Sequence, residues 1–158
     1  MAKPVAVIKT LEDSPVWVDR HLIFHYLRTN YQVWEPPLEI RIGAMNPALS
    51  AWLDGAGVDR FAYLTAYNPG SVVLPEAANR RRNALLRARL NAAGAAVYPG
   101  AGVGADGVWP PEPSFLATGL GAEAAVDLAR VFEQHALVYW QRPGPPELWW
   151  VSVPLGLV

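Results

Sequence analysis

Two asparagines on one face of an expected helix are the side chains best placed to bind a ligand. Residues 75–93 have the pattern of a long helix. At about 100° per residue, four of its side chains project within about 60° of one another: Asn79, Asn83, Leu86 and Leu90. The leucines mark this stripe as core-facing, so both carboxamides need polar partners, because an unpaired buried amide costs about 1 to 3 kcal/mol.

The loop before this helix supplies candidate partners. Thr65, Tyr67 and Asn68 end the apolar run 61–66, which is expected to be a central strand, and ligands of open α/β sheets bind beyond the carboxyl ends of strands. The loop and the two amides could therefore bind a ligand. They could equally be framework, with Asn68 forming a turn before Pro69 and the amides binding loop backbone.

Arginines on the same helix could add a positive charge to this site. Arg80 or Arg82 could hold a phosphate or another acidic group beside the first half of the helix. The alternative is a solvated helix face, which also includes Arg81, Arg87 and Arg89.

Three more polar residues are candidates from other parts of the chain. Glu112 is the candidate catalytic residue: burial could make it a general base, or it could accept backbone hydrogen bonds in a loop. Glu112 and Ser114 precede the expected strand 115–120, so they join the site only if that strand runs antiparallel to its neighbour. Gln134, at the end of an expected helix, is a separate ligand-binding candidate.

Other motifs do not predict a cofactor or a metal. Gly102, Gly104 and Gly107 match the dinucleotide-binding spacing, but the prolines that follow prevent the helix that would bind pyrophosphate. His21 and His25 are four residues apart on an expected helix, a spacing that can chelate a metal, but no carboxylate lies between them and no metal site is predicted. The sequence does not decide whether the protein is an enzyme.

Composition excludes several classes of partner. The 158 residues include 13 Lys plus Arg and 14 Asp plus Glu, so the net charge of -1 does not favour nucleic acid. The N-terminal apolar run 5–8 is too short for a signal peptide or a membrane span. The expected location is the cytoplasm, with no membrane partner.

The expected elements indicate an α/β fold, with α+β as the alternative. Helices are expected at 14–28, 47–55, 75–93 and 123–134, and strands at 38–42, 61–66, 95–98, 115–120, 136–140 and 147–153. This alternation predicts a mixed sheet of about five to six strands with helices packed on it and a C-terminal antiparallel hairpin. One domain over 1–158 is expected, with 1–12 as a candidate flexible segment.

Tryptophans mark the C-terminal hairpin as a candidate contact surface. Trp149 and Trp150 lie on opposite faces of its last strand, which is expected to be a sheet edge. One face could form a homodimer, or the first helix could cover it.

Four segments in order resemble a bacterial family catalogued as domain of unknown function 3293 (DUF3293). They are residues 65–69 (TAYNP), 79–90, 112–116 (EPSFL) and 132–136 (FEQHA). The resemblance covers roughly residues 60–140 and implies no reaction or cofactor. A glycine would be expected at Glu133.

The sequence therefore predicts a domain that binds a small polar or anionic ligand, such as a phosphate-bearing or nucleotide-like compound. The alternative is a protein-interaction or homo-oligomerising module that acts through the tryptophan-bearing hairpin.

Overall fold

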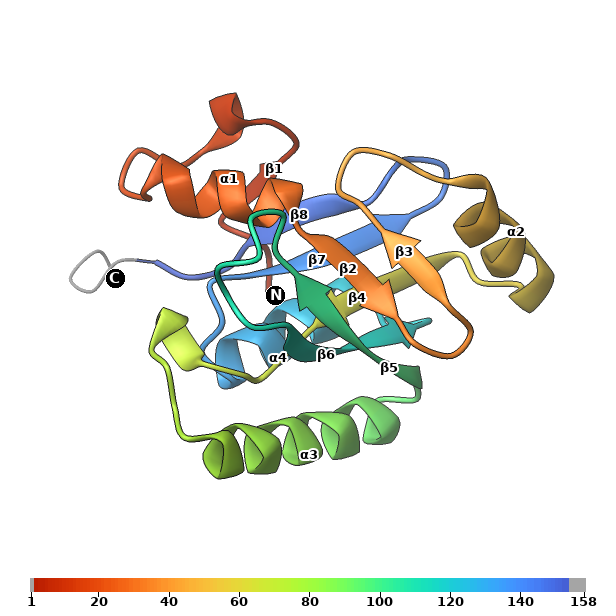
Figure 1. The fold of residues 1–158 in the computed structure, drawn as a ribbon. Helices are drawn as coiled ribbons and strands as arrows, with labels where there is room; N and C mark the ends of the chain where they lie inside the picture. Colours follow the sequence, from red (N-terminus) through yellow and green to blue (C-terminus); the bar gives the residue numbers. More distant parts are fainter. Residues whose placement is uncertain (1, 154–158) are drawn as a thin grey trace.

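The strands of residues 2–153, the part of the chain that the computed structural model describes, form one curled sheet (Figure 1). The eight strands found there are β1 (Ala6–Ile8), β2 (Asn30–Val33), β3 (Leu38–Ile40), β4 (Arg60–Leu64), β5 (Ala96–Val103), β6 (Glu112–Thr118), β7 (Ala136–Gln141) and β8 (Glu147–Trp150). The four α-helices of the same residues are α1 (Arg20–Arg28), α2 (Pro47–Ala56), α3 (Glu76–Ala92) and α4 (Ala122–Val131). Together they make a single α+β domain; the expected limits at 1 and 158 lie outside the described residues.

All neighbouring strands in the sheet are antiparallel. The order is β1-β8-β7-β4-β6-β5-β2-β3. The prediction of a mixed sheet with five to six strands is therefore wrong, and the α+β alternative is correct. The reason is that each helical crossover skips a strand: β6 lies between β4 and β5, and β4 lies between β6 and β7. The segment from β4 to β7 thus has the split β-α-β-β-α-β arrangement.

Two short strands that the sequence analysis did not predict extend this arrangement at both ends. β2 pairs with β5 and, as a hairpin, with β3. β1 comes from the candidate flexible segment and pairs with β8. The expectation that the last strand is an edge is therefore wrong, because the N-terminal strand occupies that position.

The glycine-rich stretch after residue 98 is partly strand. β5 continues to Val103, and Gly100 lies between β2 and β6. A Cβ atom at Gly100 would collide with the carbonyl oxygen of Gln32. The glycine is thus required by the close approach of β2.

Local capping explains where the helices begin. The Asp19 side chain caps α1 by accepting a hydrogen bond from the His21 N–H at 2.9 Å, so this helix starts later than the expected Ser14. Asn46 caps α2 as its cap-plus-proline sequence predicts, with 2.9 Å from its Oδ1 to the Leu49 nitrogen. In α3 the expected stripe is confirmed: the buried residues are Asn79, Asn83, Leu86 and Leu90.

The helices cover both faces of the sheet. Along β4, Ala62 and Leu64 face the core formed with α3 and α4, whereas Phe61 and Tyr63 face the opposite side, where α2 packs. α1 packs over β1 and β8 through Ile23. Figure 1 shows α3 and α4 on one side of the sheet and α1 and α2 on the other. No helix among residues 2–153 has the length and apolar character needed to cross a membrane.

Candidate functional site

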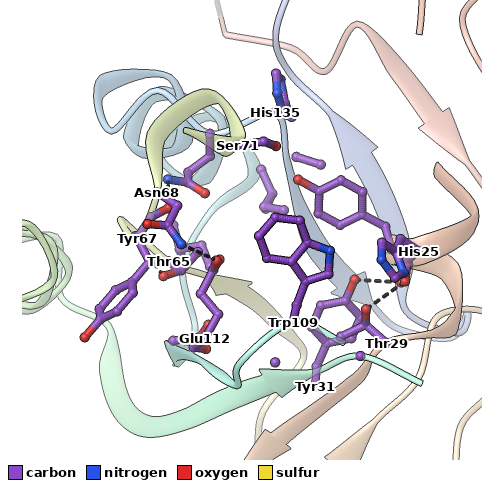
Figure 2. Close-up of a pocket in the computed structure, with 18 of the residues that line it drawn as sticks. His25, Thr29, Tyr31, Thr65, Tyr67, Asn68, Ser71, Trp109, Glu112 and His135 are labelled. Atoms are coloured by element: carbon purple, nitrogen blue, oxygen red, sulfur yellow. Dashed lines mark hydrogen bonds between the residues drawn. The ribbon is translucent and has the colours of Figure 1, made fainter. Parts of the chain in front are cut away.

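A pocket of about 400 Å³ opens on the face of the sheet that α1 covers. Its floor includes Tyr63 of β4, Ser114 of β6 and Val138 of β7, and its walls come from α1 and from the loops around residues 65–74 and 104–111. Figure 2 shows Trp109 between a polar wall that contains Glu112 and a second wall that contains His25 and Tyr31. The lining is mainly apolar, which is typical of small-molecule sites.

Glu112 provides the carboxyl group of this pocket. It lies in β6, opposite Gly102 of β5, and β6 runs antiparallel to β4. The condition under which Glu112 and Ser114 could join the loop after β4 is therefore met. The Thr65 Oγ1 donates a hydrogen bond to the Pro113 carbonyl at 2.7 Å, which ties the end of β4 to the beginning of β6.

The environment of Glu112 favours its neutral form. Burial raises the pKa of this carboxyl from 4.5 to about 7, and the hydrogen bond from Asn68 opposes the shift. That bond is long, 3.4 Å from the Asn68 Nδ2 to Oε2. No arginine or lysine lines the pocket within the described residues, so no full positive charge compensates the carboxylate. Glu112 therefore titrates near neutral pH, as a general acid or base needs to.

The two asparagines of α3 hold the loop that faces Glu112. The Asn79 Oδ1 accepts a hydrogen bond from the Asn68 N–H at 2.9 Å, and its Nδ2 donates to the Asn68 Oδ1 at 2.7 Å. The Asn83 Oδ1 accepts from the Ala66 N–H at 2.8 Å, and its Nδ2 donates to the Pro113 carbonyl at 3.0 Å. These contacts correspond to the framework interpretation. Asn79 also lines the pocket, whereas Asn83 does not.

The loop at residues 68–71 has an unusual backbone. Asn68, Gly70 and Ser71 all have positive φ, at 46°, 59° and 64°. For Ser71 this conformation costs about 1 to 2 kcal/mol, whereas asparagine adopts it more readily. The Asn68 Oδ1 also accepts a hydrogen bond from the Leu74 N–H at 3.1 Å. The loop is thus fixed with the Asn68 amide pointing towards Glu112 (Figure 2).

Four further predicted site residues line the pocket, and they differ in which hydrogen-bonding atoms are already used within the protein. The Ser114 Oγ donates to the Glu112 carbonyl at 2.8 Å, and Thr65 is held by Pro113. The Tyr67 hydroxyl donates to Glu76 at 2.7 Å, and burial raises its pKa to about 12. The Gln134 Nε2 donates to the Tyr67 carbonyl at 3.0 Å. Among the described residues, the Gln134 Oε1 has no hydrogen-bond partner and can accept one from a ligand.

The arginines of α3 lie outside the pocket lining. Arg82 braces the structure: its Nε donates to the Ala66 carbonyl at 2.9 Å and its Nη2 to the Phe132 carbonyl at 2.6 Å. Arg80 is exposed, as are the other arginines of the helix: Arg81, Arg87 and Arg89. Neither Arg80 nor Arg82 is therefore part of the lining, although the positive charge of Arg80 is near enough to the Tyr67 hydroxyl to oppose the rise in its pKa.

Sequence analysis missed one wall of the pocket as a functional surface. His25, Tyr26 and Thr29 come from α1 and the residue after it, Tyr31 comes from β2, and Trp109 comes from the loop between β5 and β6. The His25 Nε2 lies 3.6 Å from the Asp106 Oδ2. These residues have no motif spacing among themselves, so only the assembled sheet brings them together.

The tryptophans of the C-terminal hairpin pack against other side chains of the same domain. Trp150 is buried, lies flat against His135 with ring centroids 5.2 Å apart, and meets the edge of Tyr26 from α1 at 6.1 Å. Trp149 stacks on Tyr139 at 4.3 Å. The first helix thus covers Trp150, which is the intramolecular alternative for that ring.

The fold and the pocket together define an α+β domain with a split β-α-β-β-α-β core and a half-buried carboxyl in a mainly apolar pocket. Residues 64–137 match the model of the family described as "Protein of unknown function (DUF3293)", which confirms the predicted resemblance. The match begins at the last residue of β4 and ends in β7. No curated protein and no solved structure gave a significant match to the chain.

The position where the family resemblance predicts glycine has a backbone that suits glycine. Glu133 follows α4 with a φ of 57°, in the left-handed region. Its N–H donates to the Arg130 carbonyl at 3.0 Å, so it ends the helix as a C-terminal glycine commonly does.

Proposed function

We propose that this protein binds a small molecule in the pocket between α1, the sheet and the loops 65–74 and 104–111. The observation on which the proposal depends is the Glu112 carboxyl, which lies in a mainly apolar pocket. Among residues 2–153, it has no cationic partner in the pocket lining and accepts one long hydrogen bond from a side chain. A buried polar group without full compensation is unfavourable in the free protein. A ligand that completes its hydrogen bonds would remove that cost.

The proposed ligand has an apolar or aromatic body and a polar head group. The body would pack between Trp109, Tyr31 and the apolar floor (Figure 2). The head group would meet Glu112 and Gln134, which both line the pocket. Thr65, Asn68 and Asn79 would position this polar end. A volume of about 400 Å³ suits a compound of drug-like or metabolite size.

The test is an isotope-edited NMR screen of a small fragment set, with amide signals of the pocket loops as the readout. We expect several fragments to shift signals of residues 65–74 and 104–111, and the shifts to fall when Trp109 is changed to alanine. Exposed Trp17, which lies outside the pocket lining, supplies the matched control as Trp17→Ala. If no fragment shifts pocket signals, or if Trp17→Ala reduces the shifts as much as Trp109→Ala does, the proposal is wrong.

Two other functions remain predictions. An anionic ligand held by Arg80 or Arg82 would have to bind outside the pocket lining, and inorganic phosphate in the same screen tests it by shifting signals of α3 instead. A homodimer through the tryptophan-bearing hairpin predicts a mass by light scattering that rises with protein concentration. A cytoplasmic location also stays a prediction, and so does any catalytic role of Glu112.

A further inference from the structure

The charged side chains in the described lining of the pocket are acidic. Its lining contains two carboxyl groups, Glu76 and Glu112, and, among the described residues, no lysine or arginine. Glu76 is exposed at the rim and accepts the Tyr67 hydroxyl, whereas Glu112 is deeper and shielded. Once Glu112 is ionised, the pocket has a negative potential that its own side chains do not balance.

The two histidines that line the pocket do not supply the missing charge. The His25 Nε2 lies 3.6 Å from the exposed Asp106 carboxylate, so a carboxylate outside the pocket lining already faces this ring. His135 binds the Ser152 hydroxyl through Nδ1 at 3.0 Å and stacks on Trp150. Burial lowers the pKa of His135, which keeps this ring neutral at neutral pH.

The remaining walls are rich in aromatic rings. Trp109 and four tyrosines line the pocket: Tyr26, Tyr31, Tyr63 and Tyr67. The faces of such rings attract cations, most strongly in the case of tryptophan. Burial raises the pKa values of Tyr26, Tyr31 and Tyr63, so these hydroxyls stay neutral and add no competing negative charge. Trp109 is half-exposed at the mouth, where an incoming ligand meets it first.

We infer that the ligand of this pocket is an organic cation, a protonated amine on an apolar or aromatic body, with Glu112 as its counter-ion and Trp109 as its aromatic wall. The inference rests on the proposed function, because it names the chemical class of the ligand for that same pocket. An ammonium group supplies both the hydrogen bonds and the positive charge that Glu112 lacks. A neutral donor supplies only the hydrogen bonds, and a carboxylate or phosphate would meet two acidic side chains and no cation.

Binding of an amine should release protons. In the free protein near pH 7, Glu112 is about half protonated, because its pKa is about 7. Placing an ammonium beside it favours the carboxylate, so the carboxyl proton leaves to solvent while the amine keeps its own. Titration calorimetry in two buffers with different ionisation enthalpies measures this release. We expect about half a proton per bound amine near pH 7 and almost none near pH 9.

The test uses fragments that share a body and differ only in the charge of the tail. Phenyl, indolyl and cyclohexyl bodies each carry an aminoethyl, a hydroxyethyl or a carboxymethyl group. At about pH 8 we expect each amine to bind about tenfold more tightly than the alcohol with the same body, and the carboxylates to bind weakest. Glu112→Gln should remove this preference by weakening the amines about tenfold and changing the alcohols less than about threefold.

A matched variant separates Glu112 from the general charge of the pocket. Glu76→Gln removes the other lining carboxylate, and we expect it to weaken the amines by less than about threefold, because that group is exposed and screened by solvent. Alcohols or carboxylates that bind as tightly as the amines would overturn the inference while leaving the proposed function intact. Equal losses in the two variants would overturn the role of Glu112. If no fragment in any series shifts pocket signals, the proposed function itself fails.

Discussion

Glu112→Gln should make the folded protein more stable above neutral pH and leave it almost unchanged in acid. The carboxyl has a pKa of 4.5 in its ordinary state and about 7 in the fold. Between these two values the folded chain therefore binds a proton that the unfolded chain has released. Stability then falls as pH rises, because the unfolded state is the one that binds fewer protons. Glutamine has no proton to lose, so the variant avoids this decline.

The size of the effect follows from the two pKa values. The difference in free energy of unfolding between variant and wild type should grow by about 1.4 kcal/mol per pH unit across this window. Above about pH 7 it should level off near 3 kcal/mol. Local relaxation of the pocket would reduce the plateau. The Asn68 amide can still donate to a glutamine oxygen, so the variant keeps that hydrogen bond.

The assay is urea unfolding of both proteins at several pH values from about 4 to 9. Only the difference between the proteins is analysed, because every other titrating group contributes equally to both. Glu123→Gln, on an exposed turn of α4, is the control and should give only a small difference at every pH, because this side chain is exposed to solvent. A flat difference for Glu112→Gln, or a variant that becomes less stable as pH rises, would refute the argument that burial controls this carboxyl.

Four other substitutions test the packing and backbone conformation of the fold. Asn83→Leu leaves a buried backbone N–H of the loop after β4 without its partner, and urea unfolding should show a loss of about 2 kcal/mol; an unchanged stability would contradict the framework role. Glu133→Gly relieves a φ of 57° and should raise the free energy of unfolding by about 1 kcal/mol, so a lower melting temperature would count against it. Gly100→Ala forces a methyl group against a carbonyl of β2 and should cost at least about 2 kcal/mol. Gly55→Ala, in an open position on α2, should instead stabilise by about 0.5 to 1 kcal/mol, and both are checked by thermal unfolding.

The parts of the site that the sequence predicted are those controlled by local periodicity. The stripe with Asn79 and Asn83 follows from the pitch of one helix, and the two leucines beyond it show which side is buried. The polar loop at Thr65 follows from the abrupt end of an apolar strand. Capping chemistry likewise predicted the start of α2 at Pro47. In each case the deciding interactions lie within a few residues of one another.

Local sequence patterns could not show in which direction β6 runs. Whether Glu112 belongs to the site depended on that direction. Alternating helices and strands favour a parallel sheet only when a crossover returns to the adjacent position. Here each crossover passes over one strand. The same order of helices and strands along the chain therefore gives an antiparallel sheet instead of a parallel one. The sequence could state the condition for Glu112 and Ser114 to join the site. It could not show that the condition is met.

The wall with His25 and Trp109 was missed for a different reason. These residues lie more than eighty positions apart and contact the same pocket only because β2 pairs with β5. β2 itself is four residues long and directly follows a helix, so it gives little periodic signal. Gly100 is the feature of the local sequence that reflects this pairing, because the close approach of β2 leaves no room for a Cβ.

The pairing of β1 with β8 affects how the sheet forms during synthesis. A ribosome makes residues 6–8 well before residues 147–150, yet the two strands are hydrogen-bonded partners. During synthesis β1 therefore stays without this partner until β8 has emerged. Such a distant contact slows closure of the sheet and makes the protection of β1 depend on the late addition of β8.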